Sequence, residues 1–327
     1  MRDGTREMID FDLVQRHVEM AIARGRYNGP ADALDYLYQR RCLIDRDGII
    51  LPTLAGLICF GHTPQTLFPS AVVDIAQYSG VKPVSFEMIT LRKNIGGTIF
   101  TQLEETMRFI SERMQRRSTL DFSDNIERVE IGEYPLPVLR ELCLNMLCHR
   151  DYVDEHASSR VMLFRDRLEW INPGGLQPGV TVETILEAQK SRNPVIMMIC
   201  YEAGLVEGFG QGLDTVVEVL LREEMSPPHF IDVGHSFIVT VKGRDLENLS
   251  VFNTASVRQQ MLNFISRRSR TTFSDLMVSF SDRSRRSLQR DIADLIASGQ
   301  IQQHGATRSV YYTIARADSQ ENDLTAD

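Results

Sequence analysis

The stretch Glu141-Leu142-Cys143-Leu144-Asn145-Met146-Leu147-Cys148-His149-Arg150-Asp151-Tyr152 decides how the rest of this chain is interpreted. It predicts a helix, because Pro135 and Pro137 stand just before it, where a proline forgoes no helical hydrogen bond. One apolar face recurs at helical spacing: Leu139, Leu142, Met146 and Leu147. A polar row lies on another face: Glu141, Asn145, His149 and Tyr152. Such a row either holds a metal-bound phosphate ligand or forms a satisfied polar seam.

Composition places the chain among globular proteins of about two or three domains. Its 327 residues are 43% hydrophobic and 24% charged. No apolar run approaches the roughly 20 residues of a membrane helix, and the amino terminus lacks the apolar core of a signal peptide. We therefore expect a cytoplasmic protein with no membrane partner. The five cysteines are an odd number without Cys-x-x-Cys, which predicts buried thiols rather than disulfides or a zinc site.

The charge is distributed unevenly along the chain. Residues 255–315 contain nine arginines and four aspartates, a net of +5 in a chain whose total is −8, so the remainder carries −13. A basic module on an acidic body suggests that the carboxy-terminal part alone meets a polyanion.

Upstream of the opening stretch, residues 1–50 are predicted to be helical, with helices around Val14–Ile22 and over 31–43 and a turn at Asp45–Gly48. Thr53 is expected to cap a helix over 54–60 that Gly61 ends. A strand over 69–78, an amphipathic helix over 99–114 and a strand over 126–131 follow.

Downstream, residues 159–164 and 167–171 predict a hairpin that runs into Asn172-Pro173-Gly174-Gly175. A short helix or turn over 181–189 and a helix over 194–203 come next. Glu207-Gly208-Phe209-Gly210-Gln211-Gly212 then opens a helix over 213–221, and 237–241 is a strand. Backbone N–H groups at such a glycine-rich helix entry favour anions. The alternative for each glycine segment is a tight turn without a ligand.

Seven motifs follow one another in order: Ala33-Leu34-x-Tyr36-Leu37, Thr53–Leu57 with Phe60-Gly61, the opening stretch, Asp166–Glu169, Asn172–Leu176, Arg192-Asn193-Pro194 and Glu207–Gly212. This order resembles the ATP site of the GHKL superfamily (gyrase, heat-shock chaperone, histidine kinase, MutL). It resembles more closely the bacterial family labelled RecG-like carboxy-terminal, or ATP-binding transcriptional regulator. The resemblance covers roughly residues 30–245. Members usually carry an amino-terminal AlbA-type, Schlafen-like domain, whose place is missing here.

The resemblance implies an α/β (α+β) fold, a GHKL or Bergerat-like two-layer sandwich over 51–245 with its leading α/β region. Glu141 would be the general base, and Asn145 would bind Mg²⁺. His149 would line the same ATP site. Asn172 stands where GHKL proteins keep the aspartate that binds the adenine amine; an amide can still accept one hydrogen bond, with weaker discrimination. The remaining implied contacts are Gly174 and Gly175 at the base, and Gly208, Gly210, Gly212 and Arg192 at the phosphates.

Residues 255–315 predict a winged helix-turn-helix, and an acidic tail over 316–327 is expected to be disordered. The pattern gives three helices (257–265, 273–278, 283–298) and a hairpin of 301–303 with 310–314. Its third helix would present four side chains to DNA: Arg285, Arg286, Gln289 and Arg290. Ser284 and Ser287 would add hydrogen bonds, while Leu288, Ile292, Leu295 and Ile296 would form its core side. The alternative is a solvated arginine face on a dimerisation module.

These patterns favour a homodimeric transcriptional regulator that senses a nucleotide and binds DNA. The alternatives are a Mg²⁺-dependent ATPase switch and a scaffold that keeps the fold without a nucleotide. A kinase catalytic loop is excluded, because His156 follows Asp151 where Asn is required. A P-loop motor is excluded as well, because no Gly-x-x-x-x-Gly-Lys-[Ser/Thr] occurs in these residues.

Overall fold

The computed structural model describes residues 4–121, 127–206, 212–246, 258, 261–262, 264–266, 268, 270–280, 283–305 and 310–315. The chain divides into two compact units. The first comprises Met1–Gln115 and Gly132–Arg244, and the second comprises Arg116–Ile131 and Asp245–Asp327. Among the described helices, none combines the length and the apolar character needed to cross a bilayer.

The first unit is built on a six-stranded mixed sheet in the order β4-β3-β7-β8-β10-β9. Its strands are β3 (Val73–Tyr78), β4 (Met88–Ile95), β7 (Ser159–Leu163), β8 (Arg167–Pro173), β9 (His229–Asp232) and β10 (Ser236–Lys242). Strands β3 and β7 pair in parallel, and the other neighbours pair antiparallel. The predicted hairpin is confirmed as β7 and β8, which pair from Arg160↔Ile171 to Leu163↔Leu168.

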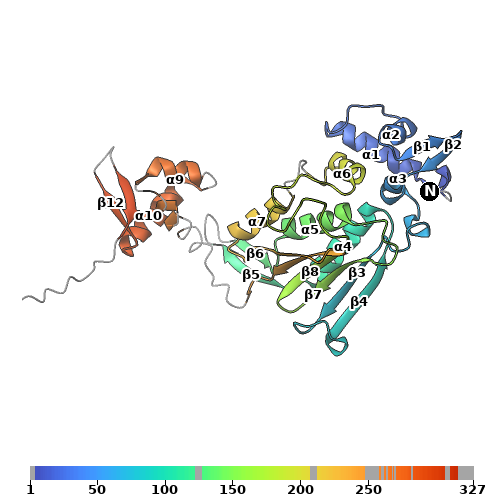
Figure 1. Ribbon diagram of the computed structural model, residues 1–327. Coiled ribbons are helices and arrows are strands. Elements are labelled where there is room, and N and C mark those ends of the chain that lie inside the picture. Colours follow the sequence, from blue (N-terminus) through green and yellow to red (C-terminus); the bar gives the residue numbers. More distant parts are fainter. Residues whose placement is uncertain are drawn as a thin grey trace, which may run out of the picture. The chain divides into compact units, whose positions relative to one another are not determined.

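Three helices lie over one face of this sheet: α4 (Ile99–Arg113), α5 (Leu136–His149) and α7 (Gly212–Arg222) (Figure 1). Helix α5 packs against α4, α7 and β8, so it forms the centre of the helical layer. Helix α7 has a strongly one-sided apolar pattern, with Leu213, Val216, Val219 and Leu220 buried. The chain therefore has the expected mixed α/β (α+β) class, a sheet beneath a layer of helices.

Helix α5 confirms the predicted apolar face, because Leu139, Leu142, Met146 and Leu147 are all buried. It ends at His149, where the Asn193 amide nitrogen donates to the carbonyl oxygens of Cys148 at 3.0 Å and Arg150 at 2.8 Å. The extension of the polar row to Tyr152 was wrong. That side chain is 3% exposed and its hydroxyl donates to the Leu147 carbonyl at 2.9 Å, so it belongs to the core.

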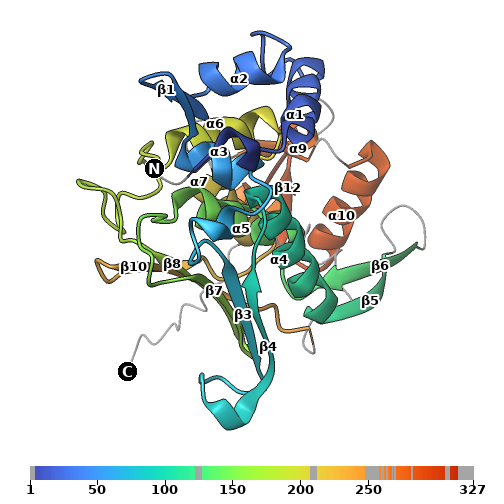
Figure 2. The same cartoon turned by 90° about the vertical axis from the view of Figure 1, so that its right-hand side faces the viewer.

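The amino-terminal segment packs beside α6 (Pro194–Glu202), as Figure 2 shows. Its elements are η1 (Arg6–Met8), α1 (Phe11–Ala23), α2 (Ala33–Gln39), β1 (Leu43–Arg46), β2 (Ile49–Pro52), α3 (Leu54–Phe60) and η2 (Pro64–Thr66). The Thr53 hydroxyl accepts from the Gly56 N–H, which confirms the predicted cap of α3. The prediction that residues 1–50 are helical throughout was wrong, because β1 and β2 form a hairpin. Asp47 (φ 57°) and Gly48 (φ 79°) supply its tight turn.

Three further features lie at the margins of this unit. Strands β4 and β9 were not predicted; they form the two edges of the sheet, and a strand exposed on both faces lacks clean apolar alternation. A short 3₁₀ turn, η3 (Ser85–Glu87), precedes β4. Residues 181–189, predicted as a short helix or turn, form turns.

The second unit contains a hairpin of β5 (Arg116–Asp121) with β6 (Glu127–Gly132), of which β5 was not predicted. It also contains a three-stranded sheet in the order β11-β13-β12 and the helices α9 and α10. These are β11 (Thr271–Thr272), α9 (Phe273–Ser279), α10 (Arg285–Ala297), β12 (Ile301–His304) and β13 (Tyr311–Ile314). Of the helix predicted over 257–265, residues 258, 261–262 and 264–265 are described, and all of them are helical; the 316–327 tail lies outside the described residues.

Candidate functional site

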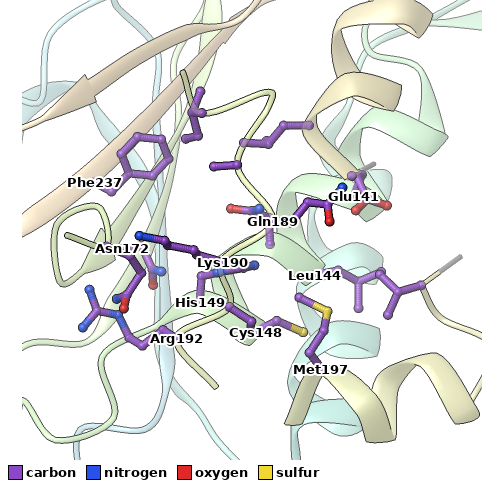
Figure 3. Close-up of a pocket in the computed structure, with 18 of the residues that line it drawn as sticks. Glu141, Leu144, Cys148, His149, Asn172, Gln189, Lys190, Arg192, Met197 and Phe237 are labelled. Carbon is purple, nitrogen blue, oxygen red and sulfur yellow. The ribbon is translucent and has the colours of Figure 1, made fainter. Parts of the chain in front are cut away.

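A cavity of about 650 Å³ in the first unit brings together most of the predicted ATP-site residues. Eight of them line it: Glu141, Asn145, His149, Asn172, Gly174, Gly175, Arg192 and Gly212. The remaining two, Gly208 and Gly210, lie outside the described residues. In Figure 3, Asn172 and Arg192 lie on the opposite side of the cavity from Glu141. Three segments that are far apart in sequence therefore share one cavity.

The polar row of α5 forms one wall of this cavity. Glu141, Asn145 and His149 lie four residues apart, so their side chains project from the same face of the helix. Glu141 extends toward the amino-terminal end of α7: a Cβ atom at Gly212 would come within 2.2 Å of the Glu141 Oε1 atom. The positive end of the α7 dipole favours a carboxylate or a phosphate at that position.

His149 closes the same row in a half-buried position near Arg192. Burial and, secondarily, the Arg192 guanidinium lower the pKa of His149 to about 4. The imidazole is therefore neutral at physiological pH and offers the cavity one acceptor and one donor rather than a positive charge.

The Asn172–Gly175 bend connects β8 to the opposite wall. Gly174 has φ 89°, and a Cβ atom there would lie 2.8 Å from the Asp151 Cβ atom. The Gly175 N–H donates to the Gly234 carbonyl oxygen at 3.0 Å, which holds the two residues close together. A Cβ atom at Gly175 would lie only 2.3 Å from that oxygen. The packing of the chain itself thus requires both glycines, independently of any ligand.

Arg192 is bound to this bend rather than free in the cavity. Its guanidinium pairs with Asp151 (Nη1 to Oδ2, 3.2 Å) and donates to the Gly175 carbonyl at 2.6 Å. The sequence predicted a phosphate contact for Arg192. The structure places it on the Asn172 side, away from Glu141 and the start of α7 (Figure 3).

The His149–Tyr152 and Arg192–Pro194 motifs, on which the family resemblance partly rests, contact each other at the wall of the cavity. Arg150 is fully buried and donates to the carbonyl oxygens of Ser70, Val72 (2.9 Å) and Ala157 (2.7 Å). Pro194 follows the capping Asn193 as the first residue of α6, where its missing N–H costs nothing. The His149–Tyr152 and Arg192–Pro194 motifs therefore fix the shape of the cavity wall.

Asn172 is 5% exposed, and its Oδ1 atom accepts a hydrogen bond from the Ser159 hydroxyl at 2.9 Å. Ser159 is fully buried and in turn accepts from Arg150 Nη1 at 3.3 Å. Among the described residues, no acceptor is found for the Asn172 amide nitrogen. Because the amide oxygen is turned toward Ser159, the nitrogen is the polar atom left for the cavity.

Sequence reasoning missed two cationic residues of the lining, Arg140 and Lys190. Arg140 donates to the Leu205 carbonyl at 2.7 Å, close to the loop that enters α7. Lys190 donates to the Pro178 carbonyl at 2.7 Å. Lys190 lies in an irregular segment without periodicity, so no pattern identifies it. Arg140 directly precedes Glu141 on α5, and this position is the signal that points to it. Apolar side chains complete the lining: Leu144, Ile185, Met197, Val206, Leu213 and Phe237.

The four predicted DNA-contacting residues of the second unit, Arg285, Arg286, Gln289 and Arg290, are all exposed on α10. The opposite side of α10 is apolar, with Leu288, Ile292 and Leu295 buried as predicted. Ser287 is also buried, at 6% exposure, so its predicted hydrogen bond to DNA was wrong. Arg283 and Arg258 instead form ion pairs inside the unit, with Asp291.

The family described as "Putative ATP-dependent DNA helicase recG C-terminal", a HATPase-type family, matches residues 156–241. This segment contains Asn172, Arg192 and Gly212, but it begins after the α5 row, which ends at His149. The DIP2311 protein from Corynebacterium diphtheriae has a similar fold, with a TM-score of 0.59 at 15% identity. The match covers 95% of this chain and 62% of that chain, so this chain spans under two thirds of its relative. No curated protein matches. The HATPase match is consistent with nucleotide and Mg²⁺ use by residues 156–241.

Proposed function

We propose that this protein is an ATP-binding transcriptional regulator, in which a nucleotide-sensing domain of GHKL type controls a DNA-binding winged helix. The observation that carries the proposal is the shared cavity. The α5 row, the Asn172–Gly175 bend and the first residue of α7 line a space of about 650 Å³. Ligand pockets commonly measure about 300–1,000 Å³ and combine apolar walls with a few polar groups. A nucleotide fits both the size and this mixture.

The orientation of the nucleotide follows from the two ends of the cavity. The base would lie on the Asn172 side, beside the neutral His149. The phosphates would lie near Arg140 and the amino-terminal end of α7, an eleven-residue helix whose dipole favours anions. Arg192, which is already bound to Asp151 and the Gly175 carbonyl, would support the base side rather than neutralise phosphates.

A Mg²⁺ ion fits this arrangement only together with the phosphates. Asn145 offers one amide oxygen, and Mg²⁺ commonly takes one or two protein oxygens with phosphates and water. The described residues contain no group of three or more His, Cys, Asp or Glu side chains that could hold a metal unaided. Glu141 would act as the general base if the nucleotide is hydrolysed. A Mg²⁺-dependent ATPase switch is therefore the second candidate.

The DNA-binding part of the proposal rests on α10. Its exposed side chains Arg285, Arg286, Gln289 and Arg290 stand opposite its buried apolar side, and its flanking strands β12 and β13 pair as a hairpin. A helix presenting arginines beside a hairpin suits a major groove and its adjacent phosphates. We expect a homodimer, because two-fold proteins match palindromic sites.

Calorimetric titration with Mg-ATP and with a non-hydrolysable analogue tests the nucleotide site, using the intact protein and Glu141→Ala. The regulator predicts saturable binding of both ligands in both proteins, with little change on substitution. An ATPase predicts turnover that Glu141→Ala abolishes while binding persists. A scaffold that keeps only the fold binds neither ligand, and this result would overturn the proposal.

A further inference from the structure

The buried hydrogen bonds of Arg150, Ser159 and Asn172 run in one direction in the structure: Arg150 donates to the Ser159 hydroxyl, which donates to Asn172. A guanidinium has only N–H donors, so the Arg150–Ser159 contact uses a lone pair of the hydroxyl oxygen. The hydroxyl has a single proton, and in the structure Ser159 donates it to Asn172 Oδ1, 2.9 Å away. Asn172 cannot rotate its amide by 180° without breaking that bond.

The consequence lies on the cavity side of Asn172. With Oδ1 occupied, the group that faces a ligand is the amide N–H₂, which can only donate. A ligand amine at this position would place its N–H groups against the N–H₂ of Asn172. Neither group can accept, so one of the two would be buried without a hydrogen bond. A ligand carbonyl oxygen would accept the hydrogen bond. Burial at 5% exposure leaves little water to compensate a mismatch.

We propose that the cavity prefers a 6-oxopurine nucleotide, of the guanine or hypoxanthine class, to an adenine nucleotide. The two base classes differ at position 6, where the first carries a carbonyl oxygen and adenine carries an amine. This inference rests on the proposed nucleotide site and specifies its base. Asn172 is the specificity-determining residue, and Ser159 is a positioning residue that holds its amide in one orientation.

The test is a calorimetric titration of the intact protein with Mg-ITP and with Mg-ATP, nucleotides whose bases differ at position 6 and the adjacent ring nitrogen. A mismatched buried hydrogen bond typically weakens binding about tenfold or more, so we expect Mg-ITP to bind at least that much more tightly. Equal binding, or tighter binding of Mg-ATP, overturns the base preference and leaves the nucleotide site intact. Binding of neither overturns both.

Two variants test the cause of the preference. In Asn172→Asp, one carboxylate oxygen still accepts from Ser159 and the other accepts from an amine, so the preference should reverse toward Mg-ATP. In Ser159→Ala, the amide is free to rotate, so both nucleotides should bind with affinities within about threefold of each other. If the Mg-ITP preference persists in Asn172→Asp, the assignment of Asn172 as the discriminating group is wrong. Circular dichroism checks that each variant is folded.

Discussion

The Glu141 carboxylate and Gly212 are so close that a Cβ atom at position 212 would come within 2.2 Å of Oε1. The contact joins the polar row of α5 to the first residue of α7, and it leaves no room for any other residue at position 212 unless Glu141 moves. Since Oε1 ends a flexible side chain, the carboxylate can move, at the cost of its position beside α7.

Gly212→Ala tests this contact through protein stability alone. Alanine favours the helix by up to about 1 kcal/mol over glycine, but here it displaces Glu141. We expect the substitution to lower the free energy of unfolding when Glu141 is present and to raise it in a Glu141→Ala background. The coupling in a double-mutant cycle, measured by urea denaturation, should be about 1 kcal/mol. Additive effects would show that the two residues do not interact.

Gly174→Ala should destabilise the protein more than Gly179→Ala, a glycine substitution five residues further along the chain. A non-glycine residue at φ 89° is strained, and its Cβ atom would also lie 2.8 Å from Asp151 and 3.0 Å from Arg192. We expect a loss of about 2–3 kcal/mol in the free energy of unfolding. Gly179→Ala is the matched control: its φ is 81°, but the nearest atom, Lys190 Nζ, is 3.5 Å away. Its loss should be about 1 kcal/mol.

Acid should destabilise the protein partly through His149. Its pKa is about 4 in the folded protein and about 6.5 in the unfolded chain, so the unfolded chain binds more protons between these values. This contribution is fully present above pH 6.5 and is lost as the pH falls toward 4. His149→Gln should therefore reduce the loss of unfolding free energy between pH 7 and pH 4.5 by about 2 kcal/mol. The exposed His156 supplies the control His156→Gln, which should leave the pH profile unchanged.

Arg150→Ala should be among the most damaging substitutions in the first unit. The buried guanidinium donates to the carbonyl oxygens of Ser70, Val72 and Ala157, which would all lose a partner. We expect a loss of about 3–5 kcal/mol in the free energy of unfolding, measured with urea. Arg160→Ala removes an exposed arginine from β7 and should cost under about 0.5 kcal/mol. Equal losses in the two variants would contradict the anchoring role of Arg150.

The sequence predicted those parts of the fold that depend on local patterns. Apolar periodicity identified α4, α5 and α7, and alternating residues identified the β7–β8 hairpin. Asp47-Gly48 is also typical of a hairpin, which the structure shows between β1 and β2, although the sequence predicted only a turn there. The end of α5 was missed because it depends on Asn193, which lies 45 residues beyond the Cys148 carbonyl that it caps.

The sequence predicted which residues line the candidate site. It did not predict which of their atoms donate or accept hydrogen bonds in the cavity. The polar row of α5, the two glycine segments and the Arg192-Asn193-Pro194 motif, taken with the family resemblance, selected eight residues that line one cavity. The direction of the Asn172 amide depends on Arg150 and Ser159, whose contact requires β7, β8 and the end of α5 to pack together. The binding of Arg192 to Asp151 is likewise a tertiary contact, which a motif in the sequence does not contain.

DNA binding through α10 predicts a specific dependence on salt. Each arginine that neutralises a phosphate contributes about one to the slope of log affinity against log salt concentration, because it releases condensed counterions. Arg286→Ala and Arg290→Ala should therefore weaken binding to a fluorescent duplex across sequences, and each should reduce the slope by about one. Arg285, whose guanidinium lies 5.5 Å from the Phe273 ring centroid, should give a smaller change. Arg16→Ala, at an exposed position of α1, is the control and should leave the slope unchanged. An affinity that does not vary with salt would show that α10 meets no polyanion and would favour a dimerisation role for this unit.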